Sequence, residues 1–425
     1  MRPSPTRAAD VPSRGVRWNA AAFAVVGACG VAINVGIARW YGAAVLGGFN
    51  SLLALFIVAS QIGAAGVHSA VLYHAPIELR AGRPTRLVLI SALAVAAAAS
   101  SLTTSALGGS AELLAALFRD DAFADSLRAA LLGFWLFPIN KTLLNFLNGV
   151  HRVRAFACGT MARYVVAASI VAICGVTGAG ASRLGLSLSI SEAVLTGLLL
   201  VFLRRDLGAT PVAEIGRWGR RQLGFGLRAL PSGVVSELNT RIDVLLLGSL
   251  AGPLATGVYS LASIFAEGLY QLVMVLRMSF DATIAALVSH REWDELERLV
   301  ARGKRLGLAV AGVVGVLSVA AFPLVGSWLI GRGEFDASWP VYGVLALGIL
   351  AASPWIPFTA FLQQAGHPGA QSVLFLIVVS MNAIGNVALI PIAGALGAAI
   401  ATAASQVVFV LALRLLVRRR VGFSL

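Results

Sequence analysis

Charged residues are scarce in this sequence. Only 12% of its 425 residues are charged, while 58% are hydrophobic, and soluble domains carry about 25% charged residues. The mean hydropathy is +0.85. This balance excludes an ordinary soluble domain and indicates a polytopic membrane protein.

Cysteine and the motifs of enzyme chemistry are also scarce or lacking. The three cysteines, Cys29, Cys158 and Cys174, have no metal-binding spacing and lie in or beside apolar segments, so we expect them to pack as small hydrophobic residues. There is no Walker A glycine loop, no HExxH and no nucleophile elbow. We therefore expect a protein that is not an enzyme and that needs no cofactor or metal.

Acidic residues are outnumbered by basic ones, 19 against 33, which gives a formal charge of +14. The basic residues cluster in every second hydrophilic gap between apolar segments, the pattern of cytoplasmic loops. This distribution argues against a nucleic-acid partner and predicts that both termini are cytoplasmic. The opposite side carries Arg39, Arg119, Arg128, Arg183 and Arg332.

Apolar segments of membrane-spanning length, about 20 residues each, recur about twelve times. They predict an all-α protein with spans at 18–38, 46–70, 87–107, 127–149, 160–178, 184–203, 224–250, 254–280, 305–330, 338–364, 370–391 and 394–417. We expect a short interfacial helix within 108–126. For 289–303 we expect an amphipathic helix on the membrane surface or a solvated connector.

The two halves of the chain share weak motifs in the same order. Gly48-Phe49-Asn50-Ser51-Leu52 matches Gly257-Val258-Tyr259-Ser260-Leu261, and similar pairs follow along the chain. This order indicates a duplication, with parallel repeats that place a substrate at the lobe interface. The predicted parts are a cytoplasmic tail (1–17), an N-terminal six-helix lobe (18–205), a cytoplasmic linker (206–223), a C-terminal six-helix lobe (224–417) and a basic cytoplasmic tail (418–425).

Ionisable residues inside the spans are the strongest functional signal, because such groups are costly in a bilayer and normally face a bundle interior or a watery cavity. In 224–250, one helix face carries Arg228, Ser232, Ser236, Asn239 and Asp243. We interpret this face as part of a polar pathway, against the alternative of isolated helix contacts. On the opposite face, Glu237 precedes Arg241 by four residues, the favoured order for a helical ion pair.

The span at 127–149 carries a second polar face, with Lys141, Asn145 and Asn148 at helical spacing. The alternative is a lysine that extends to the membrane interface. Cations outnumber acids in the spans, and Lys141, Arg228, Arg241 and Arg277 meeting in one solvated chamber would attract an anion. Guanidinium groups suit phosphate oxygens, so we expect an anionic, phosphate-bearing substrate.

The acids of the spans are candidates for ion coupling. Glu237, Asp243 and Glu267 are able to bind H⁺ or Na⁺, or to neutralise the arginines. The sequence does not separate these roles, although the spacing of Glu237 from Arg241 favours the structural one for Glu237.

The chain resembles the polysaccharide flippases, Wzx-like transporters of the multidrug/oligosaccharidyl-lipid/polysaccharide (MOP) exporter superfamily. The resemblance is carried by Ala38-Arg39-Trp40-Tyr41-Gly42, Gly47-Gly48-Phe49-Asn50, Ser60-Gln61-Ile62-Gly63-Ala64-Ala65-Gly66, Arg241-Ile242-Asp243-Val244-Leu245-Leu246-Leu247-Gly248, Gly257-Val258-Tyr259-Ser260-Leu261-Ala262, Asn386-Val387-Ala388-Leu389-Ile390-Pro391 and Gly394-Ala395-Leu396-Gly397-Ala398-Ala399-Ile400-Ala401-Thr402. The proline that the family often has just after the eighth span is absent from 280–284.

The resemblance implies two six-helix bundles around a central cavity in the bacterial inner membrane. It implies transport of an undecaprenyl-diphosphate-linked oligosaccharide to the periplasmic leaflet by alternating access, for O-antigen, lipopolysaccharide or exopolysaccharide synthesis, together with other polysaccharide assembly proteins. Diphosphate binding would then fall on Arg39, Arg228, Arg241 or Arg277. The alternatives are a cation-coupled multidrug exporter of the same superfamily and a membrane glycosyltransferase or polymerase.

Overall fold

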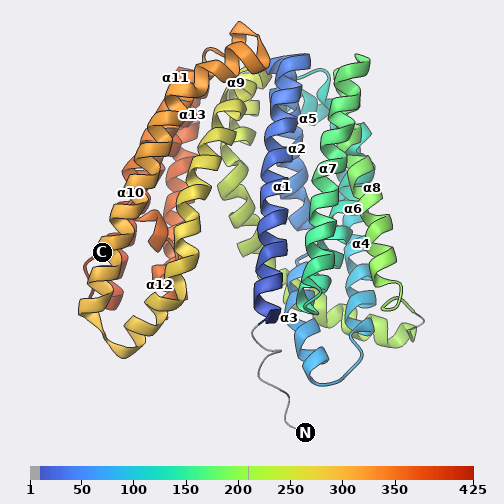
Figure 1. The fold of residues 1–425 in the computed structure, drawn as a ribbon. Helices are drawn as coiled ribbons and strands as arrows, with labels where there is room; N and C mark the ends of the chain where they lie inside the picture. The colour runs from blue at the N-terminus through green and yellow to red at the C-terminus, as the bar shows by residue number, and fades with distance from the viewer. Residues whose placement is uncertain (1–9, 209) are drawn as a thin grey trace. The chain divides into compact units, whose positions relative to one another are not determined.

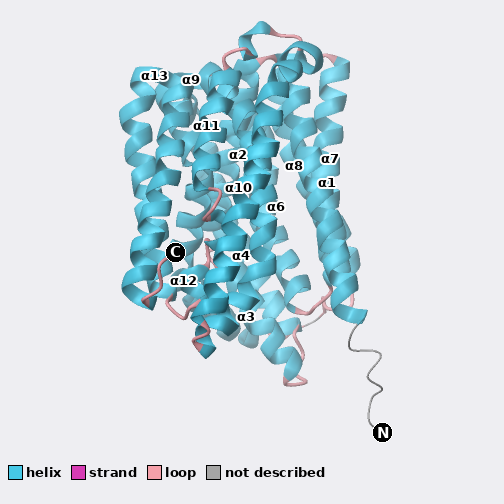
Figure 2. Cartoon of the chain, turned by 60° about the vertical axis from the view of Figure 1, so that its left-hand side comes forward, coloured by secondary structure: helices cyan, strands magenta, loops and turns pink. Residues whose placement is uncertain are grey.

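The computed structural model describes residues 10–208 and 210–425, and every regular element in these ranges is helical (Figure 2). The α-helices are α1 (Asp10–Tyr41), α2 (Ala43–Gly63), α3 (Val67–Arg80), α4 (Arg86–Gly109), α5 (Ala111–Phe118), α6 (Phe123–Gly149), α7 (Val153–Thr177), α8 (Gly185–Leu203), α9 (Val212–His290), α10 (Trp293–Leu324), α11 (Ser338–Ala352), α12 (Phe361–Gln364) and α13 (Pro368–Val421). The all-α membrane class predicted from the sequence is confirmed.

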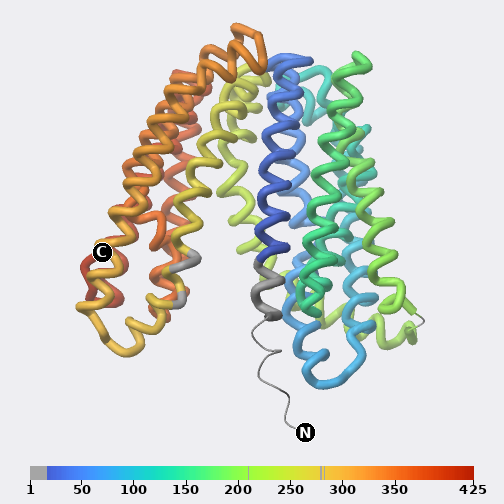
Figure 3. Tube along the Cα trace, viewed as in Figure 1, coloured from blue at the N-terminus to red at the C-terminus, as the bar shows by residue number. Residues whose placement is uncertain are grey.

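Ten helical segments of the described residues are long and apolar enough to cross a membrane. Two of them contain a sharp bend, at Gly252 in α9 (φ 81°) and at Gly394 in α13 (φ 54°). Positive φ is accessible to glycine at little cost, and each bend falls at the junction of two predicted spans (Figure 3). If α9 and α13 are each counted as two spans, the number of spans agrees with the expectation of about twelve.

Three predicted elements differ from the structure: the spans at 46–70 and 338–364, and the segment at 289–303. The span at 46–70 is wrong as one helix, because a turn through Ala65 and Gly66, both at positive φ, separates α2 from α3. The span at 338–364 breaks after Ala352, where Pro354 and Pro357 interrupt the helical hydrogen bonds.

The amphipathic segment at 289–303 is not a separate helix. A turn with Arg291 at positive φ ends α9, and α10 then runs continuously from Trp293 into the membrane-length segment. A short helix is present within 108–126 as α5, and its interfacial position remains a prediction. Of the predicted cytoplasmic tail, residues 1–9 lie outside the described part and 10–17 belong to α1.

The chain forms two compact units. Unit 1 comprises residues 1–40 and 51–241, and unit 2 comprises 41–50 and 242–425. The first part of α9, residues 212–241, therefore belongs to unit 1, and the start of α2 belongs to unit 2. The lobe and linker boundaries drawn from the sequence remain predictions.

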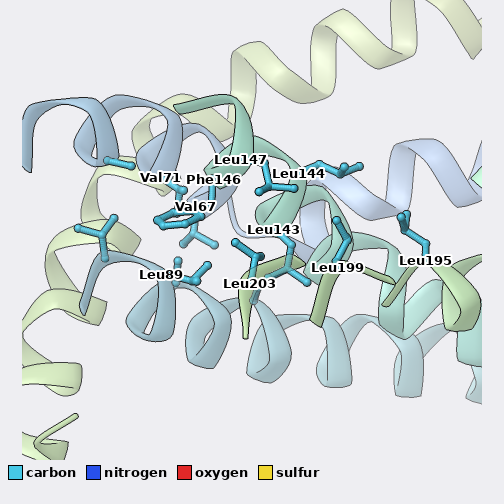
Figure 4. Close-up of a cluster of buried hydrophobic side chains, with 14 residues drawn as sticks. Val67, Val71, Leu89, Leu143, Leu144, Phe146, Leu147, Leu195, Leu199 and Leu203 are labelled. Atoms are coloured by element: carbon cyan, nitrogen blue, oxygen red, sulfur yellow. The ribbon is translucent and has the colours of Figure 1, made fainter. Parts of the chain in front are cut away.

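Unit 1 is organised around α6, which packs against α3, α4, α7 and α8. Its core is a cluster of mostly aliphatic side chains that includes Phe146 and is contributed by α3, α4, α6 and α8 (Figure 4). Leu89, Leu147, Leu195 and Leu199 in this cluster are completely buried. Between membrane helices this packing stabilises through van der Waals contacts, which makes the helices around α6 a firm support for polar groups.

Unit 2 is built on α11, which packs against α10 and α13, with α12 also on α13 (Figure 1). The start of α2 packs closely on α9 just after the Gly252 bend. A Cβ atom on Gly47 would lie 1.8 Å from the Pro253 carbonyl oxygen, and one on Gly257 would lie 1.8 Å from that of Ala43. Small residues allow this backbone contact between membrane helices.

Candidate functional site

Pro138 shapes the part of α6 that presents Lys141. Proline has no N–H, so the carbonyl of Phe134 loses its partner within the helix. Ser100 of α4 donates instead to the carbonyls of Phe134 (3.3 Å) and Trp135 (2.7 Å). A neighbouring helix thus satisfies the freed backbone, as membrane helices require, and Lys141 follows within one turn.

Lys141 lies in a polar cluster inside unit 1. Its Nζ is 3.4 Å from Glu237 Oε1 of α9, and Gln61 of α2 donates to the same oxygen at 2.7 Å. The side chains of Lys141 and Glu237 are 21% and 28% exposed. The cluster is therefore only partly covered by protein, and the Lys141 ammonium retains donors for a further partner.

The helical pair predicted between Glu237 and Arg241 is wrong. No ion pair joins them in the described part of the chain, because the Glu237 carboxylate is turned toward α6 and α2. Arg241 is half-buried, and its Nε has no hydrogen-bond partner among the described residues. A buried donor without a partner costs about 1–3 kcal/mol, and a bound anion would remove that cost.

The remaining candidate residues of unit 1 are mostly exposed. Arg228 and Asn239 are exposed on α9, and Arg228 Nε donates to the Gly224 carbonyl one turn earlier (2.9 Å). Asn145 is half-buried and Asn148 exposed on the face of α6 that carries Lys141. Arg39 lies exposed in the last turn of α1.

A buried ion pair in unit 1 was missed by the sequence analysis. Arg163 Nε of α7 lies 2.6 Å from Glu192 Oε1 of α8, and the Glu192 side chain is only 2% exposed. Asn140 of α6 donates to Glu192 Oε2 (2.8 Å), and Thr196 donates to Asn140 Oδ1 (3.0 Å). The Arg163 guanidinium also lies 4.4 Å from the centre of the Phe137 ring. The opposite charges neutralise each other, which suits a structural role.

Unit 2 contains a carboxylate surrounded by neutral donors. Asp243 of α9 accepts hydrogen bonds from the Tyr259 hydroxyl (2.7 Å), the Thr402 hydroxyl (2.8 Å) and the Asn386 amide (2.7 Å). Asn386 in turn donates to Asn382 Oδ1 (2.7 Å). In the described residues, no Lys, Arg or His forms an ion pair with Asp243. A buried carboxylate in such surroundings has the chemistry to bind a proton or a cation.

The chemistry of this Asp243 cluster fits a hard monovalent cation. Its groups are carboxylate, hydroxyl and amide oxygens, the ligands that hard cations prefer. Asn386 is fully buried, and its Oδ1 has no hydrogen-bond partner among the described residues. Asn386 and Thr402 lie in segments that carried the family resemblance, but only the folded chain brings them to Asp243.

The other unit 2 candidates lie apart from these contacts. Arg277 pairs with Asp281 one turn later (3.1 Å), and both side chains are partly exposed. Glu267 is exposed on α9. In the described residues neither Arg277 nor Glu267 forms a hydrogen bond or ion pair with Asp243, so these two candidates do not belong to the Asp243 cluster.

Comparison with known proteins identifies the family and the fold of the chain. A family model described as "Polysaccharide biosynthesis protein" matches residues 37–326. The comparison with proteins of curated function found no match to the sequence. The chain is similar in structure to lipid II flippase MurJ in an inward closed conformation, with a TM-score of 0.75 and 14% identity, covering 94% of this chain and 87% of that one.

Two further structures have the same fold. One is an inward-facing multidrug resistance MATE family transporter of the MOP superfamily, with a TM-score of 0.71 and 15% identity over 93% of this chain and 94% of that chain. The other is a MOP superfamily transporter from Pyrococcus furiosus, with a TM-score of 0.55 and 14% identity over 96% and 93%.

Proposed function

Because the chain belongs to the polysaccharide biosynthesis protein family and has the fold of MOP superfamily transporters, we propose that it is a flippase for a lipid-linked saccharide. Its substrate is an undecaprenyl-diphosphate-linked oligosaccharide, carried by alternating access from the cytoplasmic to the periplasmic leaflet of the bacterial inner membrane. The product feeds surface polysaccharide synthesis, such as O-antigen or exopolysaccharide.

The observation that supports this proposal most is the incomplete pairing of cations in the spans of unit 1. The Lys141 Nζ lies 3.4 Å from a single carboxylate oxygen, Glu237 Oε1. In the described ranges, Arg241 has an unpartnered Nε, and Arg228 has no ion pair. Isolated charges in a membrane span are costly unless a partner arrives. The diphosphate of the substrate supplies two strongly accepting groups, and arginine binds such groups bidentately.

Each candidate residue has a defined part in the proposal. Lys141, Arg228 and Arg241 bind the diphosphate, and Asn145, Asn148 and Asn239 hydrogen-bond to sugar hydroxyls. Arg277 of unit 2 and Arg39 at the end of α1 are secondary candidates for the diphosphate. Glu237 holds Lys141 in place, and Glu267 remains a weaker candidate for ion binding.

Asp243 is proposed as the ion-coupling residue. Its only partners in the described chain are neutral, so binding of Na⁺ or H⁺ would change the net charge of the Asp243 cluster. Asn382, Asn386 and Thr402 would complete the oxygen ligands of Na⁺. The same groups would stabilise a protonated Asp243 through hydrogen bonds.

A strain that lacks this gene tests the proposed function. We expect loss of surface polysaccharide, with the lipid-linked precursor retained in the cytoplasmic leaflet, and restoration by the wild-type protein. Lys141→Ala should not restore it. Arg298→Gln, which changes an exposed residue of α10, should restore it fully. Normal polysaccharide in the deletion strain would contradict the proposal.

The second candidate is a cation-coupled multidrug exporter. It is favoured by the Asp243 cluster, since an acid without a basic partner is also able to bind a cationic drug. This function predicts normal polysaccharide and increased dye sensitivity in the deletion strain, with resistance abolished by Asp243→Asn. The excess of Lys and Arg in the spans argues against it.

A further inference from the structure

A charged cavity lies in unit 1, away from Lys141 and its partners. Its volume is about 930 Å³, and it lies between the turn that joins α3 to α4 and the segment that joins α8 to α9. These segments meet at one end of the unit (Figure 1). That end carries the basic gaps after the second and sixth predicted spans, so the positive-inside rule assigns it to the cytoplasmic membrane surface.

The acids of this cavity are already neutralised, with one exception. Glu78 pairs with Arg83 (2.7 Å), and Asp206 pairs with Arg152 (2.7 Å). The exception is Glu214, which is exposed at the start of α9.

Three arginines that line the cavity are left without an acid. Arg86, Arg205 and Arg221 have no ion pair in the described ranges, and all three are exposed. They outnumber Glu214, so the cavity has a net positive charge available to a ligand. Guanidinium groups gathered around one space are the typical binding chemistry of phosphate.

Two of these guanidinium groups, those of Arg86 and Arg221, are held by contacts that do not consume their charge. Arg221 lies over the indole of Trp218, 4.9 Å from the ring centre. The guanidinium carbon of Arg86 would lie 2.8 Å from a Cβ atom on Gly208, so Arg86 packs directly on the backbone of the segment after α8. A stacked arginine keeps its outer N–H groups available to a ligand.

We propose that this cavity binds a phosphate-bearing headgroup of an anionic lipid at the cytoplasmic surface. The apolar lining from Ile77 and Leu87 beside the arginines gives room for the first carbons below the phosphate. Trp218 is the residue type that membrane interfaces favour, and basic pockets on the cytoplasmic side of membrane proteins bind anionic headgroups. This site is independent of the transport proposal.

Lipid binding to the purified full-length protein tests the site. The protein is placed in nanodiscs of phosphatidylcholine with increasing phosphatidylglycerol, and bound lipid is counted by native mass spectrometry after gentle release. We expect Arg86→Gln and Arg221→Gln each to lower retention of phosphatidylglycerol at least about fivefold, since each removes a charge-assisted contact. Arg217→Gln is the matched control, because Arg217 is exposed on α9 and does not line the cavity.

A second arm distinguishes a lipid headgroup from free phosphate. Inorganic phosphate at millimolar concentration is added to the phosphatidylcholine nanodiscs, and thermal stabilisation is recorded. The lipid proposal predicts no stabilisation by phosphate in any variant. Stabilisation by phosphate that Arg86→Gln and Arg221→Gln abolish would overturn the lipid source. Equal retention of phosphatidylglycerol by all variants, or an equal loss in Arg217→Gln, would overturn the site.

Discussion

At the scale of residues, the ionisable groups Lys141 and Asp243 are held by partners from distant parts of the chain. Lys141 and Asp243 stand out in any apolar segment, because a charge there is costly and therefore rare. The partner of Lys141 is Glu237, far away in the sequence, and those of Asp243 include Asn386 and Thr402. Neutral Asn and Thr are common in membrane helices, so no local signal marked them.

Glu192 escaped the sequence analysis for a related reason. It is a single acid in an otherwise apolar span, and only the packing of α7 on α8 shows that Arg163 neutralises it. The spacing argument that favoured Glu237 with Arg241 failed because contacts between helices in unit 1 override a helical pair worth about 0.2–0.5 kcal/mol.

The buried pair of Arg163 and Glu192 predicts a large loss of stability when only one partner is removed. Glu192→Leu leaves the arginine buried and unpaired, which should cost about 3–5 kcal/mol. The double variant Arg163→Met with Glu192→Leu removes both charges and should recover most of the loss. Thermal unfolding in detergent, followed by tryptophan fluorescence, measures both. A single variant as stable as the wild type would refute the structural role.

His74 of α3 predicts a loss of stability in acid. Burial, and then the charge of Arg221, lower the pKa of His74 below its ordinary value of 6.5, while Glu78 opposes the shift. The unfolded chain therefore binds the proton more tightly than the folded one, so stability falls as pH drops below about 6.5.

His74→Gln should reduce this acid dependence. The melting temperature of wild type and variant between pH 8 and 5 checks it, and parallel curves for the two proteins would contradict the assignment.

At the scale of elements, apolar length and glycine position predicted most spans. The predicted junctions at 250–254 and 391–394 coincide with the bends at Gly252 and Gly394. Breaks inside an apolar run were harder to predict. The turn after Gly63 is flanked by apolar residues on both sides, and the proline-rich break after Ala352 still reads as hydrophobic.

The backbone contact between α2 and α9 in unit 2 predicts a strict size limit. Gly257→Ala places a methyl group against the Ala43 carbonyl, and such overpacking should cost about 1–3 kcal/mol or more. Gly268→Ala is the control, since a Cβ there meets no atom within 4 Å. Melting temperatures of both variants test the contact, and equal stability would show that the helices adjust freely.

At the scale of the whole molecule, the chain is two compact units of similar length joined through α2 and α9. The repeated motifs in the two halves led us to expect two lobes, and two units are present. The paired segments that begin with Gly48 and Gly257 both contribute to unit 2, because the start of α2 packs on α9. Sequence spacing does not predict that the start of α2 belongs to the same unit as the second part of α9, since this depends on contacts formed only in the folded chain.

Translocation in proteoliposomes tests the central claim most directly. The purified protein is reconstituted with a fluorescent undecaprenyl-diphosphate oligosaccharide, and transfer between leaflets is followed with and without a Na⁺ or H⁺ gradient. Our account predicts transfer that a gradient accelerates, a decrease of about tenfold or more for Lys141→Ala from the lost charge-assisted contact, and transfer by Asp243→Asn that no longer responds to either gradient. Absence of transfer by the wild-type protein, or transfer unaffected by both substitutions, would contradict it.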